Sequence, residues 1–149
     1  MDFKEFLIEA KKNGYANSDE VQVKKFKDGA KEFIYKKGKW LYRDRYFGFS
    51  PFIGQEIVWK DGKAVWIMNY LGEILKDTIS AKEIYSFLKK ALFYPDLIVP
   101  VRGPQKFEDN NFKYVNIGGG LLDKFRYTEI IFYKGERVYE LECHGGMIK

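Results

Sequence analysis

One stretch of the chain occurs twice, and this repeat constrains the fold more than any other feature of the sequence. Residues 52–75 recur as residues 125–148, a shift of 73 positions. Six aligned pairs are identical, namely Phe52/Phe125, Glu56/Glu129, Ile57/Ile130, Gly62/Gly135, Val65/Val138 and Gly72/Gly145. About one or two identities would be expected by chance over this length at ordinary composition. The sequence therefore predicts a duplicated structural unit, an internal repeat 52–75 / 125–148.

Each copy has the pattern of a β-hairpin. Runs of alternating residues flank a two-residue turn, Asp61-Gly62 in the first copy and Lys134-Gly135 in the second. Strict alternation predicts that the core faces are made of Ile57, Trp59, Trp66, Met68 and Tyr70 in the first copy and Ile130, Phe132, Tyr139, Leu141 and Cys143 in the second. The other face of the first hairpin would then hold Glu56, Val58, Val65, Ile67 and Asn69.

The remaining elements complete a single domain. Asp2 and Ser80 each precede a helical pattern, the second of which ends at Phe93. Further elements are predicted as strands at Lys31–Lys36, Lys39–Phe47 and Phe112–Ile117, a strand or extended edge at Leu97–Val101, a short element at Val21–Phe26, and a turn at Gly118–Gly120. Together they predict one α+β domain over residues 1–149, with a predominantly antiparallel curved sheet, two repeated β-hairpins and two main helices packed on one face.

The composition is that of a folded protein without a marked preference for polyanions. Hydrophobic residues make up 46% of the 149 residues. The net charge is +5, but acids and bases are interspersed, so a nucleic-acid partner is not favoured. Cys143 is the only cysteine, which rules out an internal disulfide, and no apolar run reaches the length of a membrane span. The sequence therefore predicts a cytoplasmic protein with no membrane partner.

Carboxylates are predicted to gather on the polar face of the second hairpin. With Lys134-Gly135 as the turn, Glu129 would lie opposite Glu140, and Glu142 would follow on the same face. The same face is predicted to hold His144, while the first copy places Glu56 and Asn69 at the positions that match Glu129 and Glu142. Opposed like charges are destabilising unless something compensates them. Such a group could bind a cation or a ligand amine, or hold one carboxyl with a raised pKa for acid–base chemistry.

Arginines offer a structural alternative to a site. Arg102, Arg126, Arg43 or nearby lysines could neutralise the acids in an ion-pair network. Arg43 could also bind an anion or pair with Glu32, and alternation places Asp44 on the opposite side of that strand. No spaced acidic loop or patterned histidine accompanies the carboxylates, so the sequence predicts no metal site and no cofactor.

Several short motifs resemble a known family. They are residues 42–48 (YRDRYFG), 52–56 (FIGQE), 66–70 (WIMNY), 102–104 (RGP), 138–140 (VYE) and 144–146 (HGG). In this order they resemble the uncharacterised domain-of-unknown-function family 5680. Members of that family are small bacterial and archaeal proteins, some joined to helix-turn-helix regions, so the resemblance implies a sensing or regulatory domain. The chain departs from the family pattern at Tyr127, where the second copy would carry a glycine.

Three functional hypotheses follow. The first is a non-catalytic domain that binds a small polar or cationic ligand, or a protein partner, on the polar face of the sheet. The second is a hydrolase or lyase that uses Glu56, Glu129 or Glu140 with His144. The third is nucleic-acid binding through lysines and exposed aromatic residues. The valine-rich outer face could instead be buried in a homodimer.

Overall fold

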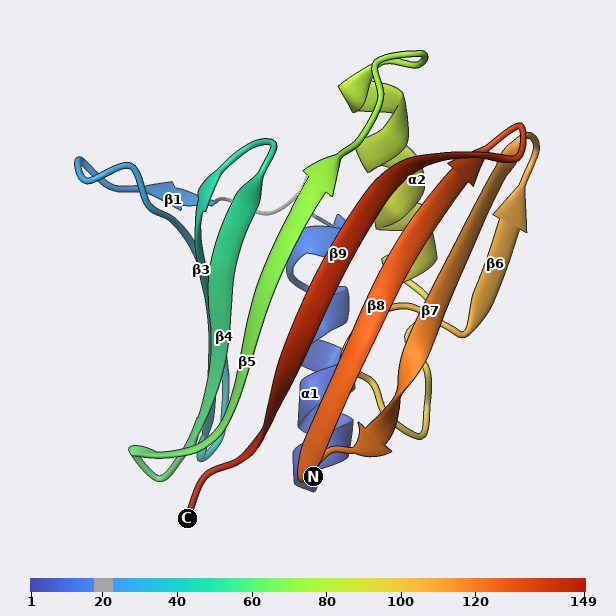
Figure 1. The fold of residues 1–149 in the computed structure, drawn as a ribbon. Helices are drawn as coiled ribbons and strands as arrows, with labels where there is room; N and C mark the ends of the chain where they lie inside the picture. Colours follow the sequence, from blue (N-terminus) through green and yellow to red (C-terminus); the bar gives the residue numbers. More distant parts are fainter. Residues whose placement is uncertain (18–22) are drawn as a thin grey trace.

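An antiparallel sheet curves around two helices in the computed structural model, which describes residues 1–17 and 23–149 (Figure 1). Within these residues the strands are β1 (Lys24–Lys25), β2 (Lys31–Lys37), β3 (Trp40–Gly48), β4 (Phe52–Lys60), β5 (Lys63–Ile74), β6 (Lys106–Asp109), β7 (Phe112–Leu121), β8 (Lys124–Tyr133) and β9 (Glu136–Met147). The helices are α1 (Phe3–Lys12) and α2 (Ala81–Leu92), with a short 3-10 turn η1 (Tyr15–Asn17) after α1. The predicted α+β fold class is confirmed.

The strand order divides the sheet into two halves with the same layout. The order is β1-β2-β3-β4-β5-β9-β8-β7-β6, and every neighbouring pair is antiparallel. In each half a helix precedes a meander of four strands, α1 before β2–β5 and α2 before β6–β9. The halves join through the β5–β9 pair, where Tyr70 lies opposite Cys143, the residue 73 positions later. The two meanders therefore meet edge to edge at this antiparallel pair.

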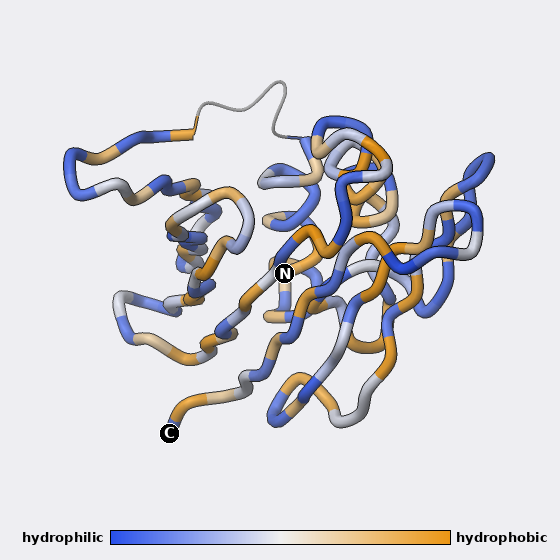
Figure 2. The backbone as a smooth tube through the Cα atoms, turned by 45° about the horizontal axis from the view of Figure 1, so that its top comes forward, coloured by the Kyte–Doolittle hydropathy of each residue, from blue (hydrophilic) through white to orange (hydrophobic). Residues whose placement is uncertain are grey.

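Both helices begin at the caps that the sequence predicts, and both cover the same face of the sheet (Figure 1). The side chain of Asp2 accepts a hydrogen bond from the amide of Glu5, and the side chain of Glu5 accepts one from the amide of Asp2. Ser80 accepts one from the amide of Glu83. The helices bury the apolar side chains Phe6, Leu7 and Ala10 from α1 and Ile84, Phe87, Leu88, Ala91 and Leu92 from α2. Along the strands, apolar and polar residues alternate (Figure 2).

Both hairpins contain a β-bulge at the same place. In the first, Trp59 pairs with Ala64 but Val58 pairs with Trp66, so Val65 is the extra residue. In the second, Phe132 pairs with Arg137 and Ile131 pairs with Tyr139, which leaves Val138, 73 positions after Val65, as the extra residue. A bulge shifts the alternation of one strand relative to its partner. These matching registers support the internal repeat, which remains an inference from the sequence.

The bulges make part of the predicted core face wrong. Trp66, Met68 and Tyr70 face the helices as predicted, and so do Tyr139, Leu141 and Cys143 in the second hairpin. Their partners are not the predicted Ile57, Trp59, Ile130 and Phe132 but the residues one position earlier in the chain, Glu56, Val58, Glu129 and Ile131. Two carboxylates predicted on the polar face therefore lie on the face that the helices cover.

Three local predictions also differ from the structure. Leu97–Val101 forms no strand; its first turn is closed by Asp96, which accepts hydrogen bonds from the amides of Ile98 and Val99. Gly118–Gly120 lies inside β7 rather than in a turn. Of the element predicted at Val21–Phe26, residues 23–26 are described and contain β1, and Val21 and Gln22 lie outside the described residues. In the part of the chain described, neither helix has the length and apolar character of a membrane span.

Candidate functional site

A cavity of about 350 Å³ lies on the face of the sheet that the helices cover, towards the β2–β5 half. Its walls are largely aromatic and come from η1, β3, β4, β5, α2 and the β3–β4 connection: Tyr15, Tyr46, Phe49, Phe52, Tyr70 and Tyr85. Its polar lining includes the carboxylates of Asp44 and Glu56 and the cationic side chains of Lys25, Lys31, Lys89 and Arg102. An apolar cavity with a few charged groups is the usual form of a small-molecule site.

Asp44 is the carboxylate of this cavity without a cation beside it. Its side chain is buried, with 8% exposure, and accepts a hydrogen bond of 2.6 Å from the hydroxyl of Tyr70. Across the described residues no lysine or arginine forms an ion pair with it. Burial, followed by the negative charge of Glu56, raises the pKa of Asp44 to about 7, although the Tyr70 hydroxyl and the charges of Lys11 and Arg102 act against this. Asp44 is therefore poised to change its ionisation near neutral pH.

Glu56, in contrast, is satisfied by the protein. Lys11 on α1 places its Nζ 2.6 Å from Oε2 of Glu56 and also donates to the backbone carbonyl of Val101. The hydroxyl of Tyr42 on β3 donates to Oε1 at 2.6 Å. Lys11 thus joins a helix, a strand and a loop, and Glu56 enters the cavity lining as an already paired group.

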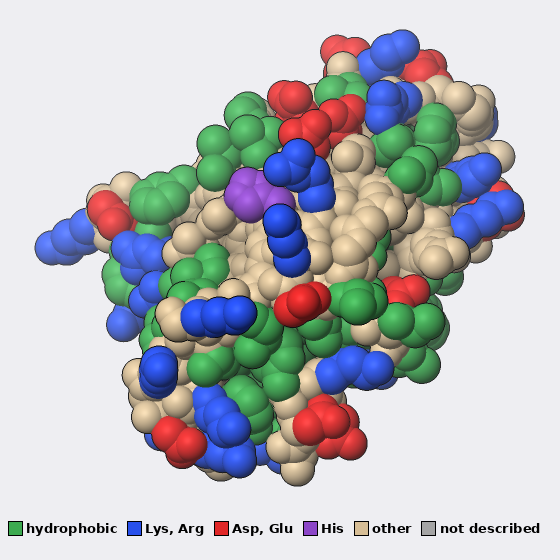
Figure 3. Space-filling view, turned by 60° about the horizontal axis from the view of Figure 1, so that its bottom comes forward, with side chains coloured by type: hydrophobic (Ala, Val, Ile, Leu, Met, Phe, Trp, Pro, Cys, Tyr) green, Lys and Arg blue, Asp and Glu red, His purple; other side chains and the backbone are tan. Residues whose placement is uncertain are grey.

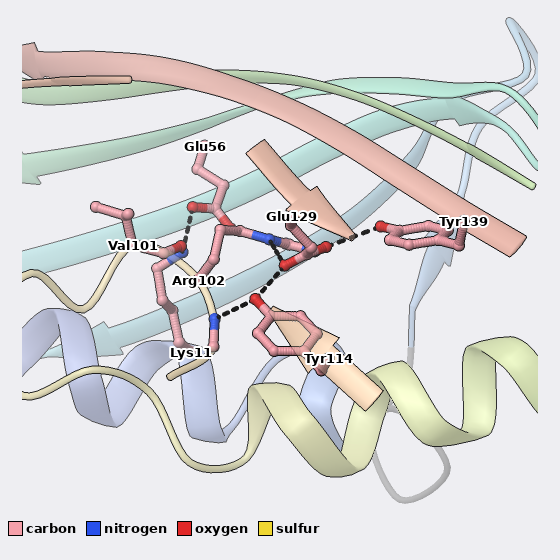
Figure 4. Close-up of polar contacts among 8 residues, drawn as sticks. Lys11, Glu56, Val101, Arg102, Tyr114, Glu129 and Tyr139 are labelled. Carbon is pink, nitrogen blue, oxygen red and sulfur yellow. Dashed lines mark hydrogen bonds and ion pairs between the residues drawn. The ribbon is translucent and has the colours of Figure 1, made fainter. Parts of the chain in front are cut away.

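Glu129 forms a closed network in the second half of the sheet (Figure 4). It is completely buried and receives two hydrogen bonds from Arg102, of 2.9 Å from Nε and 2.6 Å from Nη2. The hydroxyls of Tyr114 and Tyr139 donate to the same carboxylate at 2.6 Å and 2.9 Å. Burial acts to lower the pKa of Arg102, but Glu129 outweighs it and raises that pKa well above the ordinary value. This predicted site residue has a structural position rather than a place in the cavity.

The two halves carry different side chains at the position of Asp44. Tyr42 pairs with Val58 and Tyr114 with Ile131, 73 positions after Val58, so both halves carry a tyrosine that donates to the buried glutamate. Asp44, opposite Glu56, corresponds to Asn116, opposite Glu129. The first half therefore has an extra carboxyl where the second half has an amide.

A glycine makes room for the partner of Asp44. A Cβ on Gly54 would lie 2.4 Å from the hydroxyl oxygen of Tyr70 and 2.6 Å from Cβ of Tyr46. In the second half the corresponding pair is Tyr127 opposite Cys143, with the large and small residues exchanged. In the first copy, the absence of a side chain at Gly54 leaves room for the Tyr70 ring. The second copy has Tyr127 at the matching position and does not leave this room.

We expect Gly54→Ala to lower the free energy of unfolding by about 1–3 kcal/mol, because the added methyl group would displace the Tyr70 ring from Asp44. Chemical denaturation measures this change. Gly119→Ala is the matched control, since a Cβ there has no atom within 4 Å, and its stability should stay within about 0.5 kcal/mol of the parent protein. Equal stability of the two variants would contradict the close packing of Tyr70 over Gly54.

The other predicted site residues lie on the opposite, convex face. Asn69 accepts a hydrogen bond of 2.8 Å from Gln55, and its Nδ2 lies 3.3 Å from Nε2 of His144. The guanidinium of Arg43 lies 5.1 Å from the ring centre of Trp59, so its predicted pairing with Glu32 is wrong. The partner of Glu32 is Arg45, which lies opposite it at 3.1 Å.

The predicted row of opposed carboxylates is also wrong. Because of the bulge, Glu129 lies opposite Leu141, and Glu140 lies opposite Ile130 on one side and Glu73 on the other. Glu140 and Glu142 stay on the convex face, where Arg137 lies 3.5 Å from Glu140. On the face shown in Figure 3, His144, the purple side chain, sits among basic and acidic side chains that are interspersed.

Asp44, Tyr70 and Lys11 were not predicted as site residues. Alternation around Asp44 did carry a signal, because it places this acid on the same side of the strand as two aromatic residues, Tyr42 and Tyr46. No local signal points to Lys11, since it reaches Glu56 across 45 positions of sequence. Among the residues described, no group of three or more His, Cys, Asp or Glu is arranged to hold a metal ion.

Comparison with known proteins matches the chain to a family but assigns no activity to it. The model of a family described as a domain of unknown function, DUF5680, matches residues 44–148. No curated protein and no solved structure matches the chain. The matched region contains Asp44, Gly54, Glu56 and Tyr70, while Lys11 lies before it.

Proposed function

The chain belongs to the DUF5680 family, whose description assigns no function, and we propose that it is a non-catalytic domain that binds a small polar ligand in the concave cavity. The observation that carries this proposal is Asp44, a buried carboxyl that lines the cavity and has no cationic partner within the described chain. Burying such a group is costly, so its presence is most simply explained by a ligand that completes it.

The size and lining of the cavity support the proposal. Its volume of about 350 Å³ falls in the range of small-molecule sites, roughly 300–1,000 Å³. The rings around it contact one another, with Phe52 5.9 Å from Tyr70 and 6.1 Å from Tyr85 between centroids. Contacts of this kind hold the walls in place before a ligand arrives, which lowers the entropic cost of binding.

The competing hypotheses receive less support. A hydrolase or lyase based on Glu56, Glu129 or Glu140 with His144 needs these side chains on one face. Glu56 and Glu129 lie under the helices, away from His144. Glu140 shares the convex face with His144, but it is paired with Arg137 there, and His144 contacts Asn69. Nucleic-acid binding needs a continuous basic stripe, and the face in Figure 3 mixes both signs of charge. A sensing or regulatory role in the cytoplasm is compatible with a ligand-binding domain and is part of this proposal.

A fragment screen by protein-observed NMR tests the proposal. We expect bound fragments to shift resonances of cavity residues such as Tyr46 and Tyr85, and to bind at least about tenfold more weakly to Phe49→Ala. Phe49 is 58% exposed and contacts Tyr85 edge-on at 5.1 Å, so its removal should leave the fold intact. Phe93→Ala, at an exposed ring outside the cavity lining, is the control and should bind as the parent does. Shifts confined to the convex face, or no shifts at all, would refute the proposal.

A further inference from the structure

The carboxylates and the lysines of the cavity lie at different depths. The carboxylates of Asp44 and Glu56 are buried, with 8% and 3% exposure. The lysines are more accessible, since Lys25 is exposed and Lys31 is half-buried. Arg102 also lines the cavity and is buried, with 8% exposure, but it is paired with Glu129, and Glu56 is paired with Lys11. The carboxylate of Asp44 is therefore the uncompensated charge at the floor, while the lysines place positive charge towards solvent.

The floor lacks one hydrogen-bond donor. Tyr70 donates to Oδ1 of Asp44, and in the described chain no other group donates to this side chain. Glu56 is already held by Lys11 and Tyr42, and Arg102 is engaged by Glu129. A ligand group that reaches the floor therefore meets Asp44, which has one oxygen without a hydrogen bond from the described residues. The carboxylate of Glu56 lies opposite Asp44 on the neighbouring strand.

The middle and rim of the cavity suit a flat body and an anion. Phe52 and Tyr85 line the middle, and ring faces of this kind also attract cations. The ammonium of Lys31 lies 5.7 Å from the ring centre of Tyr46, where it marks the outer edge of the lining. An anionic group at the rim would gain the charge of Lys31 with little loss of solvation.

From this arrangement we propose that the cavity takes a zwitterionic ligand with a flat apolar body, which presents a primary amine to Asp44 and a carboxylate or phosphate group to Lys31 and Lys25. This inference rests on the proposed function and adds the chemical class of the ligand. The protonated amine supplies the missing donor and charge at the floor, and the anion complements the rim. A ligand with the opposite polarity would place like charges together at both ends.

A matched set of probes tests the inference by titration calorimetry. 4-(Aminomethyl)benzoate carries both groups, 4-methylbenzylamine only the amine, and 4-methylbenzoate only the acid; the phosphonate analogue of the first distinguishes phosphate from carboxylate. We expect the two zwitterions to bind at least about tenfold more tightly than either half. Asp44→Asn should remove this advantage for the amine probes and leave 4-methylbenzoate unchanged. Lys31→Gln should remove the advantage for the probes that carry an acid group and leave the affinity of 4-methylbenzylamine unchanged. Glu142→Gln, on the convex face, should leave the affinity of every probe unchanged.

The pH dependence provides an independent readout. The groups that face Asp44 are Glu56, Tyr70, Lys11 and Arg102, and together with burial they set its pKa at about 7. Amine binding requires ionised Asp44, so affinity should fall about tenfold from pH 8 to pH 6 in the parent protein and stay level in Asp44→Asn. If 4-methylbenzoate binds as tightly as the zwitterions, and its affinity is the same for the parent protein and for Asp44→Asn, the inferred ligand class is wrong but the proposal of a ligand-binding domain is not. If none of the probes and no screened fragment shifts cavity resonances, the proposed function is wrong as well.

Discussion

Replacing Glu129 with glutamine should lower the free energy of unfolding by about 3–5 kcal/mol. The carboxylate is completely buried and receives hydrogen bonds from Arg102, Tyr114 and Tyr139. The neutral amide leaves the guanidinium of Arg102 buried without a counter-charge, and one acceptor oxygen becomes a donor that faces existing donors. Urea denaturation at pH 7 measures the change in the midpoint and slope of the transition.

The sign of the change in unfolding free energy distinguishes the buried position of Glu129 in the structure from the position that strict alternation of the sequence predicts. If Glu129 lay opposite Glu140, as strict alternation predicts, removing its charge would relieve repulsion and stabilise the protein. Glu142→Gln is the control, because Glu142 is exposed, and its effect should stay within about 0.5 kcal/mol. The double variant Arg102→Met with Glu129→Gln should lose less than the sum of its single variants, since neither then leaves a buried charge unpaired. A stabilised or unchanged Glu129→Gln protein would contradict the buried ion pair.

Periodicity predicted the hairpins because their turns and alternating residues are local features. Asp61-Gly62 adopts the left-handed backbone that a tight turn requires, with φ of 50° and 78°. The helices were equally accessible to prediction, since Asp2 and Ser80 form their caps with residues three positions away. Element type therefore followed from neighbours in sequence.

The site could not be predicted in the same way, because a bulge cannot be recognised from alternation. Val65 and Val138 are ordinary strand residues in the sequence, yet each occupies the extra position that moves Glu56 or Glu129 to the helix face. The cations that neutralise these acids, Lys11 and Arg102, come from outside the hairpins. Burial of the acids and the identity of their partners are thus properties of the tertiary structure alone.

Asp44→Asn should stabilise the protein at pH 8, by on the order of 2–4 kcal/mol, and leave its stability at pH 4 almost unchanged. The pKa of Asp44 is raised from 3.8 to about 7 by burial and then by Glu56. The folded state therefore holds this proton more tightly than the unfolded state does. The contribution of Asp44 to stability is complete below pH 3.8 and is lost as the pH rises towards 7.

The asparagine variant removes this loss, because an amide stays neutral at every pH and its oxygen can still accept from Tyr70. The second half of the sheet already carries an amide at the matching position, Asn116, so the substitution suits the backbone. Thermal unfolding of both proteins between pH 4 and pH 8 measures the difference. Parallel stability curves would show that Asp44 is ionised without cost, in which case its lack of a cation would no longer point to a ligand.

A stabilising Asp44→Asn variant would also connect stability with function. Residues that lower stability in the absence of a ligand are expected where binding requires them. A ligand amine at Asp44 would offset the cost of ionisation, so it should stabilise the parent protein more at pH 8 than at pH 5 and should stabilise the variant little at either pH. The half of the sheet that carries Gly54, Tyr70 and Asp44 in place of Tyr127, Cys143 and Asn116 would then be less stable without a ligand because its residues are arranged for binding.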